Sequence, residues 1–326
     1  MKITIKDVAK QAGVGIGTVS RVLNNGSVKK ETRERVEQAI RLLNYKPNTY
    51  ARGLKSNHTN TVALIIPTIW HPFFSEFTYY IETFLEKNGL KLLLCNANHN
   101  SEKEREYIQM VKQNKVDGII GITYSHIDQY VSSSLPFVSI DRHFSEDVVY
   151  VTADNEAGGI LAAQELIKRG CQSLCFIGGH QTAINETKKR RQAFESECHN
   201  QNRDYYVLDM PEPILDLDHQ LTSFFKKHPD IDGIFAINDT MALDVIRFLN
   251  KIGKSVPKDV QVIGFDGQKH SEHSPYLVSS IAQPIETMAK VAVELLIDII
   301  GKKDVAQRTI LPVTFVAGKT TLNKEE

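Results

Sequence analysis

Residues 12–25, AGVGIGTVSRVLNN, decide the fold because they place three glycines, Gly13, Gly15 and Gly17, at alternate positions. A dinucleotide-binding loop needs the pattern G-x-G-x-x-G after a buried strand, so that backbone N–H groups can face a pyrophosphate. Thr18 stands where the third glycine of that pattern belongs, and the residues before Gly13 have the spacing of a helix rather than a strand. The glycines therefore predict a turn between two helices, not a phosphate-binding loop.

The predicted helix before this turn has start and stop signals. Thr4, followed three places later by Asp7, resembles a capping box, and Gly13 suits the left-handed residue that ends a helix. The apolar stripe of this helix consists of Ile5, Val8, Ala9 and Ala12.

Two further apolar stripes follow the turn. The first consists of Val19, Val22 and Leu23, and the second, within residues 30–45, consists of Val36, Ile40 and Leu43. Three short helices with apolar faces can close one small core. A generic helical bundle would give the same stripes, so the charge distribution has to separate the two interpretations.

Positive charge is concentrated in the same region. Residues 1–58 contain 12 Lys and Arg against 4 Asp and Glu, a net charge of +8. The whole chain is formally neutral, with 39 basic and 39 acidic residues, so the remainder carries −8 (27 against 35). A basic helix-turn-helix is the electrostatic footprint of a DNA-binding protein, because neutralising phosphates releases counterions. The acidic remainder should face away from DNA.

Several stretches now resemble one family. TIKDVAKQAGV (4–14), TVSRVLN (18–24), ETRERV (31–36), LNYKPN (43–48) and ARGLKSNHT (51–59) are similar to the headpiece of the lactose/galactose-repressor family. VDGII, SIDR, GFD and SIAQP extend the resemblance over nearly all 326 residues. The resemblance implies a bacterial transcriptional regulator with a helix-turn-helix DNA-binding headpiece (1–47), a hinge helix and linker (48–60), and a bilobed effector-binding and dimerisation core (61–326).

The resemblance places the second helix in the major groove of DNA, with Ile16, Gly17 and Arg21 at the base-reading positions. Arg21 can bond the O6/N7 pair of a guanine, Ile16 can touch a thymine methyl, and Gly17 offers no side chain. Gly15 replaces the serine that commonly caps this helix, and Lys29 replaces a usual cap before the third helix. These departures put the operator sequence in doubt, not DNA binding. The other headpiece residues implied to contact DNA are Thr4, Thr18, Ser20 and Asn24.

The stretch from Asn48 to Ser56 predicts a short helix, marginal on its own in water. Composition alone favours a plain linker with Leu54 in a contact between domains. The resemblance instead implies a hinge that folds when two copies meet on DNA, with Leu54 wedged between base pairs in the minor groove. The hinge residues implied to contact DNA are Asn48, Tyr50, Ala51, Leu54 and Lys55.

Beyond residue 60, apolar strand-like runs such as VALII and LKLLL alternate with helical patterns. Runs that are apolar on both faces indicate a parallel sheet covered by helices on each side. About 265 residues is long for one such sheet, so we expect two similar lobes, each a doubly wound parallel sheet, as in periplasmic binding proteins. Folds of this kind bind ligands in the cleft between the lobes.

The resemblance implies an effector cleft formed by polar residues at strand ends and by the aromatic run HPFF (71–74). Carboxylates and an amide around one arginine fork can bond several sugar hydroxyls, while an aromatic ring stacks on an apolar sugar face. The implied effector residues are Phe73, Phe74, Thr123, Asp141, Arg142, Arg190, Asn238 and Asp266. All of these except Thr123 have an alternative role: inward packing for the phenylalanines, capping of the next helix for Asp and Asn, and surface ion pairs for the arginines.

Two modes of regulation remain open. Some members of the family respond to a phosphorylated carrier protein and can lack the cleft arginine. Because Arg190 is present, we favour a small-molecule effector, a sugar or sugar phosphate, and SIDRHF faintly resembles regulators of sucrose-type disaccharide genes. The sign of the response is not predicted. The C-terminal stretch LPVTFVAGKTTLNKEE has no heptad pattern, which favours a homodimer over a tetramer.

Other classes of protein fit less well. An exported sugar-binding protein would need a signal peptide, but Lys2, Lys6 and Asp7 interrupt the N-terminus, and no run of about 20 apolar residues suits a membrane. G-x-S-x-G, Walker and H-E-x-x-H patterns are absent from the sequence, so we expect no enzyme. The four cysteines form no C-x-x-C pair. We therefore expect a cytoplasmic protein with reduced, mostly buried thiols and with neither metal nor cofactor.

Overall fold

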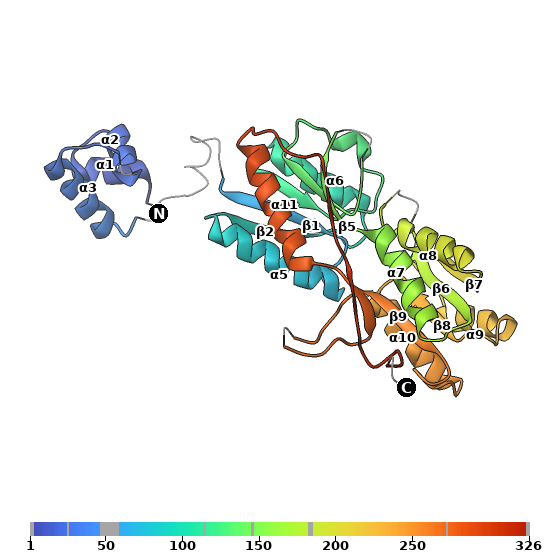
Figure 1. The fold of residues 1–326 in the computed structure, drawn as a ribbon. Helices are drawn as coiled ribbons and strands as arrows, with labels where there is room; N and C mark the ends of the chain where they lie inside the picture. Colours follow the sequence, from blue (N-terminus) through green and yellow to red (C-terminus); the bar gives the residue numbers. More distant parts are fainter. Residues whose placement is uncertain are drawn as a thin grey trace. The chain divides into compact units, whose positions relative to one another are not determined.

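The computed structural model describes residues 3–24, 26–45, 59–113, 115–144, 147–181, 185–271 and 273–323. The chain forms two compact units, Met1–Thr59 and Asn60–Glu326. Figure 1 shows a small helical unit in blue and a larger unit of mixed helices and strands. Within the described part of the chain, no helix is both long enough and apolar enough to cross a membrane.

The small unit consists of three helices, α1 (Ile5–Ala12), α2 (Ile16–Leu23) and α3 (Lys30–Leu42). Helix α1 begins after Thr4, whose backbone N–H and hydroxyl donate to the Asp7 carboxylate at 2.8 and 2.7 Å. These bonds lower the pKa of Asp7. Helix α1 ends at Gly13, which has a φ of +64°. Both predicted ends of this helix are confirmed.

The three helices enclose one apolar core, as the stripes predict. Gly15 and Lys29 stand at the N-caps of α2 and α3, and neither supplies a side-chain cap. Leu23, Ile40 and Leu43 are partly buried at the edge of the core. The core itself consists of Val8, Ala9, Ala12, Val19, Val22, Val36 and Ala39.

The larger unit has two lobes, each built on a six-stranded sheet. The first lobe has the strand order β11-β5-β4-β3-β1-β2, with every neighbouring pair parallel. Its strands are β1 (Thr61–Ile66), β2 (Lys91–Asn96), β3 (Gly118–Gly121), β4 (Phe137–Ile140), β5 (Val149–Ala153) and β11 (Arg308–Leu311).

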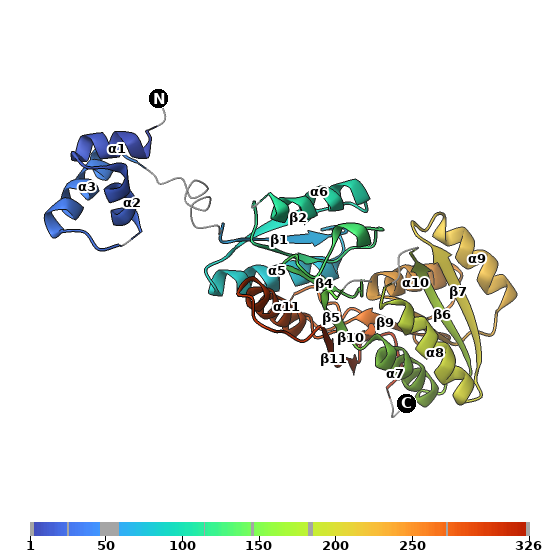
Figure 2. The ribbon, with the colours of Figure 1, turned by 90° about the horizontal axis from the view of Figure 1, so that it is seen from above.

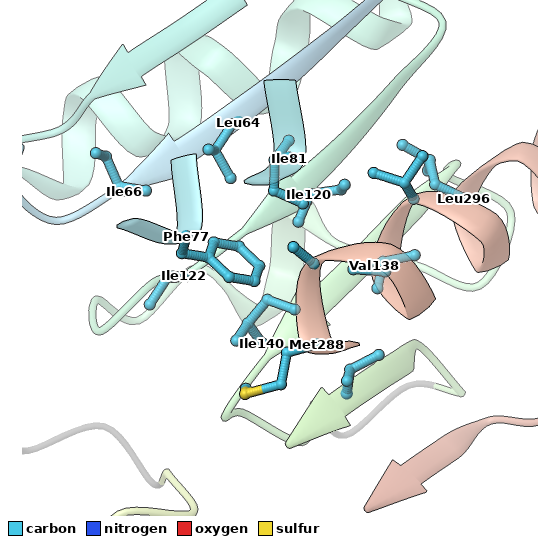
Figure 3. Packing of buried hydrophobic residues seen from close by; sticks show 14 of the residues in the cluster. Leu64, Ile66, Phe77, Ile81, Ile120, Ile122, Val138, Ile140, Met288 and Leu296 are labelled. Carbon is cyan, nitrogen blue, oxygen red and sulfur yellow. The ribbon is translucent and has the colours of Figure 1, made fainter. Parts of the chain in front are cut away.

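Helices cover both faces of the first sheet, as expected of a doubly wound fold. Helices α5 (Pro72–Lys87) and α11 (Ile285–Ile300) pack together on one face, and α6 (Ser101–Lys112) lies on the other (Figure 2). Figure 3 shows how Phe77 and Ile81 of α5 and Met288 of α11 meet the strand residues Ile120 and Val138. This apolar layer fixes the strand ends that carry the cleft residues.

The second lobe has the strand order β12-β10-β9-β8-β6-β7. Its strands are β6 (Ser173–His180), β7 (Asp204–Pro211), β8 (Gly233–Ala236), β9 (Gln261–Asp266), β10 (Ser279–Ala282) and β12 (Thr314–Val316). Helices α7 (Asn155–Lys168) and α8 (Lys188–Asn200) pack on one face, and α9 (Leu217–Lys227) and α10 (Asp239–Lys251) on the other. The predicted pair of doubly wound lobes is confirmed.

One edge strand departs from the predicted parallel arrangement. Strand β12 pairs with β10 in the antiparallel sense. It follows β11 of the first lobe directly, without the helical crossover that a parallel neighbour requires. The chain also passes between the lobes from β5 to α7 and from β10 to α11, so three connections join the two lobes.

Candidate functional site

A cleft of about 600 Å³ lies between the lobes at the carboxyl ends of their strands. Asp141 follows β4, Asn238 follows β8, and Asp266 ends β9. Such strand ends are where open α/β sheets bind ligands. Six of the predicted effector residues line the cleft: Phe73, Phe74, Asp141, Arg190, Asn238 and Asp266.

Arg190, in the first turn of α8, is buried at the centre of this group. Its Nε donates to Asn155 Oδ1 at 2.7 Å, and its Nη1 donates to the backbone oxygen of Ile237 at 2.8 Å. The guanidinium carbon lies 3.6 Å from the ring centroid of Phe265. Burial lowers the pKa of Arg190, and the nearby Asp266 and Asp141 raise it. The arginine fork is therefore held rigidly, with two carboxylates close to it.

Both cleft carboxylates are buried. Burial raises the pKa of Asp141 and of Asp266, and the charge of Arg190 opposes the rise in each case. The hydroxyl of Thr152 donates to Asp141 at 2.7 Å, and the amide of Gln283 donates to Asp266 at 2.8 Å. Asp141 and Asp266 have φ values of +54° and +118°. The first lies in the left-handed region that aspartate tolerates, and the second lies outside it and is costly for a residue other than glycine.

The phenylalanines at the start of α5 form an apolar part of the cleft. The rings of Phe73 and Phe74 meet edge to face at a centroid distance of 5.5 Å. Phe73 also stacks on Phe77 in the core of the first lobe. The two predicted roles, inward packing and lining of the cleft, are therefore combined in these rings.

Two predicted effector residues, Thr123 and Arg142, do not line this cleft. The guanidinium of Arg142 donates to the backbone oxygen of Ser125 at 2.5 Å and pairs with Asp128 at 2.8 Å. It also lies over the ring of Phe144. Arg142 thus holds the segment after β3, which includes the fully buried Thr123. The chain leaves β4 at Asp141, whose φ of +54° is left-handed, and the two neighbouring side chains go to different places: Asp141 lines the cleft, whereas Arg142 reaches Ser125.

Many residues that line the cleft were not among the predicted effector residues, and His71, Tyr124 and Gln283 are three of them. His71 joins the lobes: its Nε2 lies 3.3 Å from the Thr240 hydroxyl and 3.5 Å from Asn238 Nδ2. His71 and Gln283 lie in the quoted stretches HPFF and SIAQP, but their spacing carried no sign that they meet Asn238 and Asp266.

Asn238 has two roles. Its side-chain oxygen accepts from the backbone N–H of Met241 at 2.8 Å, which caps α10, and the residue also lines the cleft. A second hydrogen bond between the lobes runs from the backbone N–H of Glu186 to the backbone oxygen of Asp141 at 2.9 Å.

The outward face of α2 carries the predicted base-reading residues. Ile16 is 45% exposed, a large value for an apolar side chain, and Gly17 and Arg21 are exposed beside it. Val19 and Val22 point into the core instead. Thr4 and Asn24 are exposed, and Thr18 and Ser20 are partly buried. The predicted hinge contacts Asn48, Tyr50, Ala51, Leu54 and Lys55 lie outside the described residues.

The four cysteines are buried and unbonded, as predicted. Burial raises the pKa of Cys95 to about 11 and those of Cys171 and Cys198 to about 12. Across the described ranges, no three His, Cys, Asp or Glu residues are grouped so that they could hold a metal ion.

Two family models match the chain. "Bacterial regulatory proteins, lacI family" matches residues 4–48, and "Periplasmic binding proteins and sugar binding domain of LacI family" matches residues 59–319. A ribose operon repressor of Halalkalibacterium halodurans is 35% identical over 325 residues, covering 99% of this chain and 98% of that protein. A sucrose operon repressor of Streptococcus mutans is 35% identical over 332 residues, covering 98% and 100%. A crystal structure of the lac repressor dimer bound to operator and the anti-inducer ONPF has the same fold, with a TM-score of 0.85 and 22% identity over 99% of this chain and 100% of that one.

Proposed function

The chain belongs to the LacI family of bacterial regulatory proteins, and we propose that it represses a carbohydrate-utilisation operon and responds to a sugar bound in the cleft between its lobes. Membership makes the chain a DNA-binding transcriptional regulator with a helix-turn-helix headpiece. The relatives named as ribose and sucrose operon repressors support the choice of a carbohydrate operon.

The observation that carries this proposal is the buried arrangement of Arg190 with Asp141 and Asp266 inside the cleft. A guanidinium offers several donors in a fixed plane, whereas carboxylates only accept hydrogen bonds. Adjacent sugar hydroxyls, which both donate and accept, match such a set. We assign Arg190 and the two carboxylates to the hydroxyls, and the ring of Phe74 to an apolar sugar face.

The charges favour a neutral sugar over a sugar phosphate. In the buried part of the cleft, Asp141 and Asp266 face the single guanidinium of Arg190. Farther out, Lys189 pairs with Glu186 and Arg191 pairs with Asp209. Lys188 and Glu212 also line the cleft, with opposite charges. A phosphate would therefore meet no surplus of positive charge.

On the DNA side, we propose that Ile16, Gly17 and Arg21 read bases and that Leu54 enters the minor groove. The lac repressor structure, which is a dimer bound to operator, supports a homodimer that presents two headpieces to a near-palindromic site. Control by a phosphorylated carrier protein is the alternative to a sugar effector. A role in sugar transport is the remote alternative.

A regulator of this class needs no catalytic activity, so we expect no hydrolysis or phosphorylation of the bound sugar. DNA binding also requires the protein to work in the bacterial cytoplasm. Incubating the purified protein with candidate sugars and analysing the products tests the first expectation.

The decisive experiment selects genomic DNA fragments that bind the purified full-length protein, with and without mono- and disaccharides. Enrichment of one palindrome whose retention changes with one sugar supports the proposal and also gives the sign of the response. Enrichment that no sugar changes would count against a sugar effector and favour another metabolite or a protein partner. The Arg190→Ala variant should keep DNA binding and lose the response to the sugar, and an intact response in it would contradict the assigned site.

A further inference from the structure

A fully buried carboxylate lies behind the cleft and does not line it. Asp239 is the first residue of α10, next to the helix cap Asn238, and its side chain is 0% exposed. Burying a carboxylate is costly unless hydrogen bonds compensate for the lost water. The partners of Asp239 therefore indicate what this residue is for.

Every described partner of the Asp239 carboxylate donates a hydrogen bond to it. The backbone N–H of Gln268 donates to Oδ2 at 2.6 Å, and the hydroxyl of Ser280 donates to Oδ1, also at 2.6 Å. The backbone N–H of Gly267 is a further donor, and it also donates to the Ser280 hydroxyl at 3.0 Å. A carboxyl group whose hydrogen-bond partners are all donors matches the ionised form. Asp239 thus ties α10 to the turn at 266–268 and to β10.

The backbone of the stretch GFDG (264–267) leaves room for this carboxylate. A Cβ on Gly264 would lie 2.1 Å from Asp239 Oδ1, so only glycine fits there. Gly267 has a φ of +76°, and a Cβ on it would lie 2.6 Å from the Cβ of Ala282. Both glycines are therefore explained by the close approach of this turn to Asp239 and to β10.

The turn carries Asp266, one of the proposed effector-binding residues. Asp266 accepts from the Gln268 side chain at 3.4 Å and from Gln283 at 2.8 Å, and its carboxylate faces Arg190. The backbone of Gln268, held by Asp239, sets where its side chain reaches Asp266. We propose that Asp239 is a positioning residue for the effector: it fixes the 266–268 turn and thereby the carboxylate that Asp266 presents to a sugar hydroxyl. This inference rests on the proposed sugar-binding function.

The same arrangement gives Asp239 an electrostatic effect that a purely structural residue would lack. The titratable groups that interact with Asp239 and Asp266 come from several elements. They are Arg190 on α8, His71 and Glu76 at the start of α5, Asp141 after β4, and Tyr124 after β3. Burial and the charge of Asp266 raise the pKa of Asp239. The two carboxylates titrate as a pair, and their mutual repulsion raises the pH at which the pair takes up its first proton. Asp239→Asn removes that first step and leaves Asp266 to titrate without this negative neighbour. Sugar binding would then survive to lower pH.

The test uses the full-length protein and titrates D-ribose, D-fructose and sucrose by calorimetry across about pH 3 to 8, an interval that brackets the value of about 3.9 for a free aspartate. Asp239→Asn keeps the shape but turns an NH₂ group toward one of the donors. Asp244→Asn is the matched control, because it makes the same change on the exposed side of α10. We expect Asp239→Asn to lower the affinity for the sugar that the wild type binds by tenfold or more. The acid limb of sugar binding should move to lower pH, and DNA affinity without sugar should stay unchanged.

Each result decides one question. Sugar affinity of Asp239→Asn within twofold of wild type would overturn the inference, and so would a loss of affinity with an unmoved acid limb. If Asp239→Asn does not fold, Ser280→Ala replaces it, because that variant removes one donor from the carboxylate; it should lose affinity at least threefold, and unchanged affinity would overturn the inference. A wild type that binds none of the three sugars counts against the proposed function instead, and fragment selection with a wider sugar panel then decides that question separately.

Discussion

Replacing Gly17 with alanine should stabilise the proposed recognition helix, although the change lies on the surface that we propose faces DNA. Gly17 is the second residue of α2, and no heavy atom lies within 4 Å of a Cβ built there. Glycine inside a helix costs about 0.8–1.0 kcal/mol relative to alanine, because it loses more backbone freedom on folding. With no steric penalty to offset this gain, the helix should become more stable by about that amount, or about four- to fivefold in its opening equilibrium.

Gly13 provides the matched control with the opposite sign. A Cβ on Gly13 would also have room, with its nearest contact 3.9 Å away at Arg35, but the φ of +64° is left-handed. That conformation costs an alanine about 1–2 kcal/mol. Gly13→Ala should therefore destabilise the turn by about five- to thirtyfold in the opening equilibrium.

Hydrogen–deuterium exchange of the full-length protein without DNA measures both effects, in peptides that cover residues 5–24. Exchange in α2 should slow in Gly17→Ala and quicken in Gly13→Ala, while peptides of the core stay unchanged. Equal shifts in the same direction for both variants would refute the reasoning, because space alone, and not backbone conformation, would then set the outcome.

Three further predictions concern the cleft. His71→Ala removes a contact between the lobes and should weaken sugar binding by about three- to tenfold in calorimetry, as expected for one hydrogen bond. Affinity equal to wild type would show that the contact does not contribute to sugar binding. Arg142→Met should leave sugar affinity within twofold but lower the free energy of unfolding in urea by about 1–3 kcal/mol, because buried carbonyl groups lose their donor; a tenfold loss of affinity would restore Arg142 to the site. Because burial raises the pKa of Asp141 and Asp266, sugar affinity should fall as the pH is lowered, with a midpoint above the value of about 3.9 for a free aspartate; a midpoint at or below that value would mean that ionised carboxylates are not required.

Local signals in the sequence were sufficient for the three headpiece helices and for the alternation of strands and helices in the larger unit. The capping pair Thr4 and Asp7 and the stop at Gly13 act within one helical turn, so they can be recognised without tertiary information. Apolar runs such as residues 61–66 are long enough to require burial on both faces, which implies covering helices. The antiparallel direction of the edge strand β12 was not predicted, because it depends on where the chain re-enters the second lobe and not on the residues of the strand.

The candidate site was less predictable, because neighbours in sequence can face different ways. Asp141 and Arg142 are adjacent, yet one lines the cleft and the other binds the segment after β3. His71 and Gln283 are separated from their partners by long stretches of chain, and only folding brings them together. Nothing in the sequence indicated that Asp239 supports the 266–268 turn, because that role depends on the absence of a side chain at Gly264.

The cleft residues and the contacts between the lobes overlap, and this overlap bears on how a sugar could act on DNA binding. The backbone oxygen of Asp141 accepts from Glu186 across the cleft, while Asn238 contacts His71 across it. A sugar that bonds the side chains of Asp141 and Asn238 must therefore act on residues that already join the lobes, so its binding free energy depends on how the lobes are arranged.

A ligand shifts an equilibrium only by its difference in affinity for the two states. If the DNA-bound state has a different lobe arrangement, the sugar changes operator affinity and DNA changes sugar affinity by the same factor. Measuring sugar affinity with and without saturating operator should therefore give the same ratio as measuring operator affinity with and without saturating sugar, and a ratio of one in both would show that the cleft is not coupled to DNA binding.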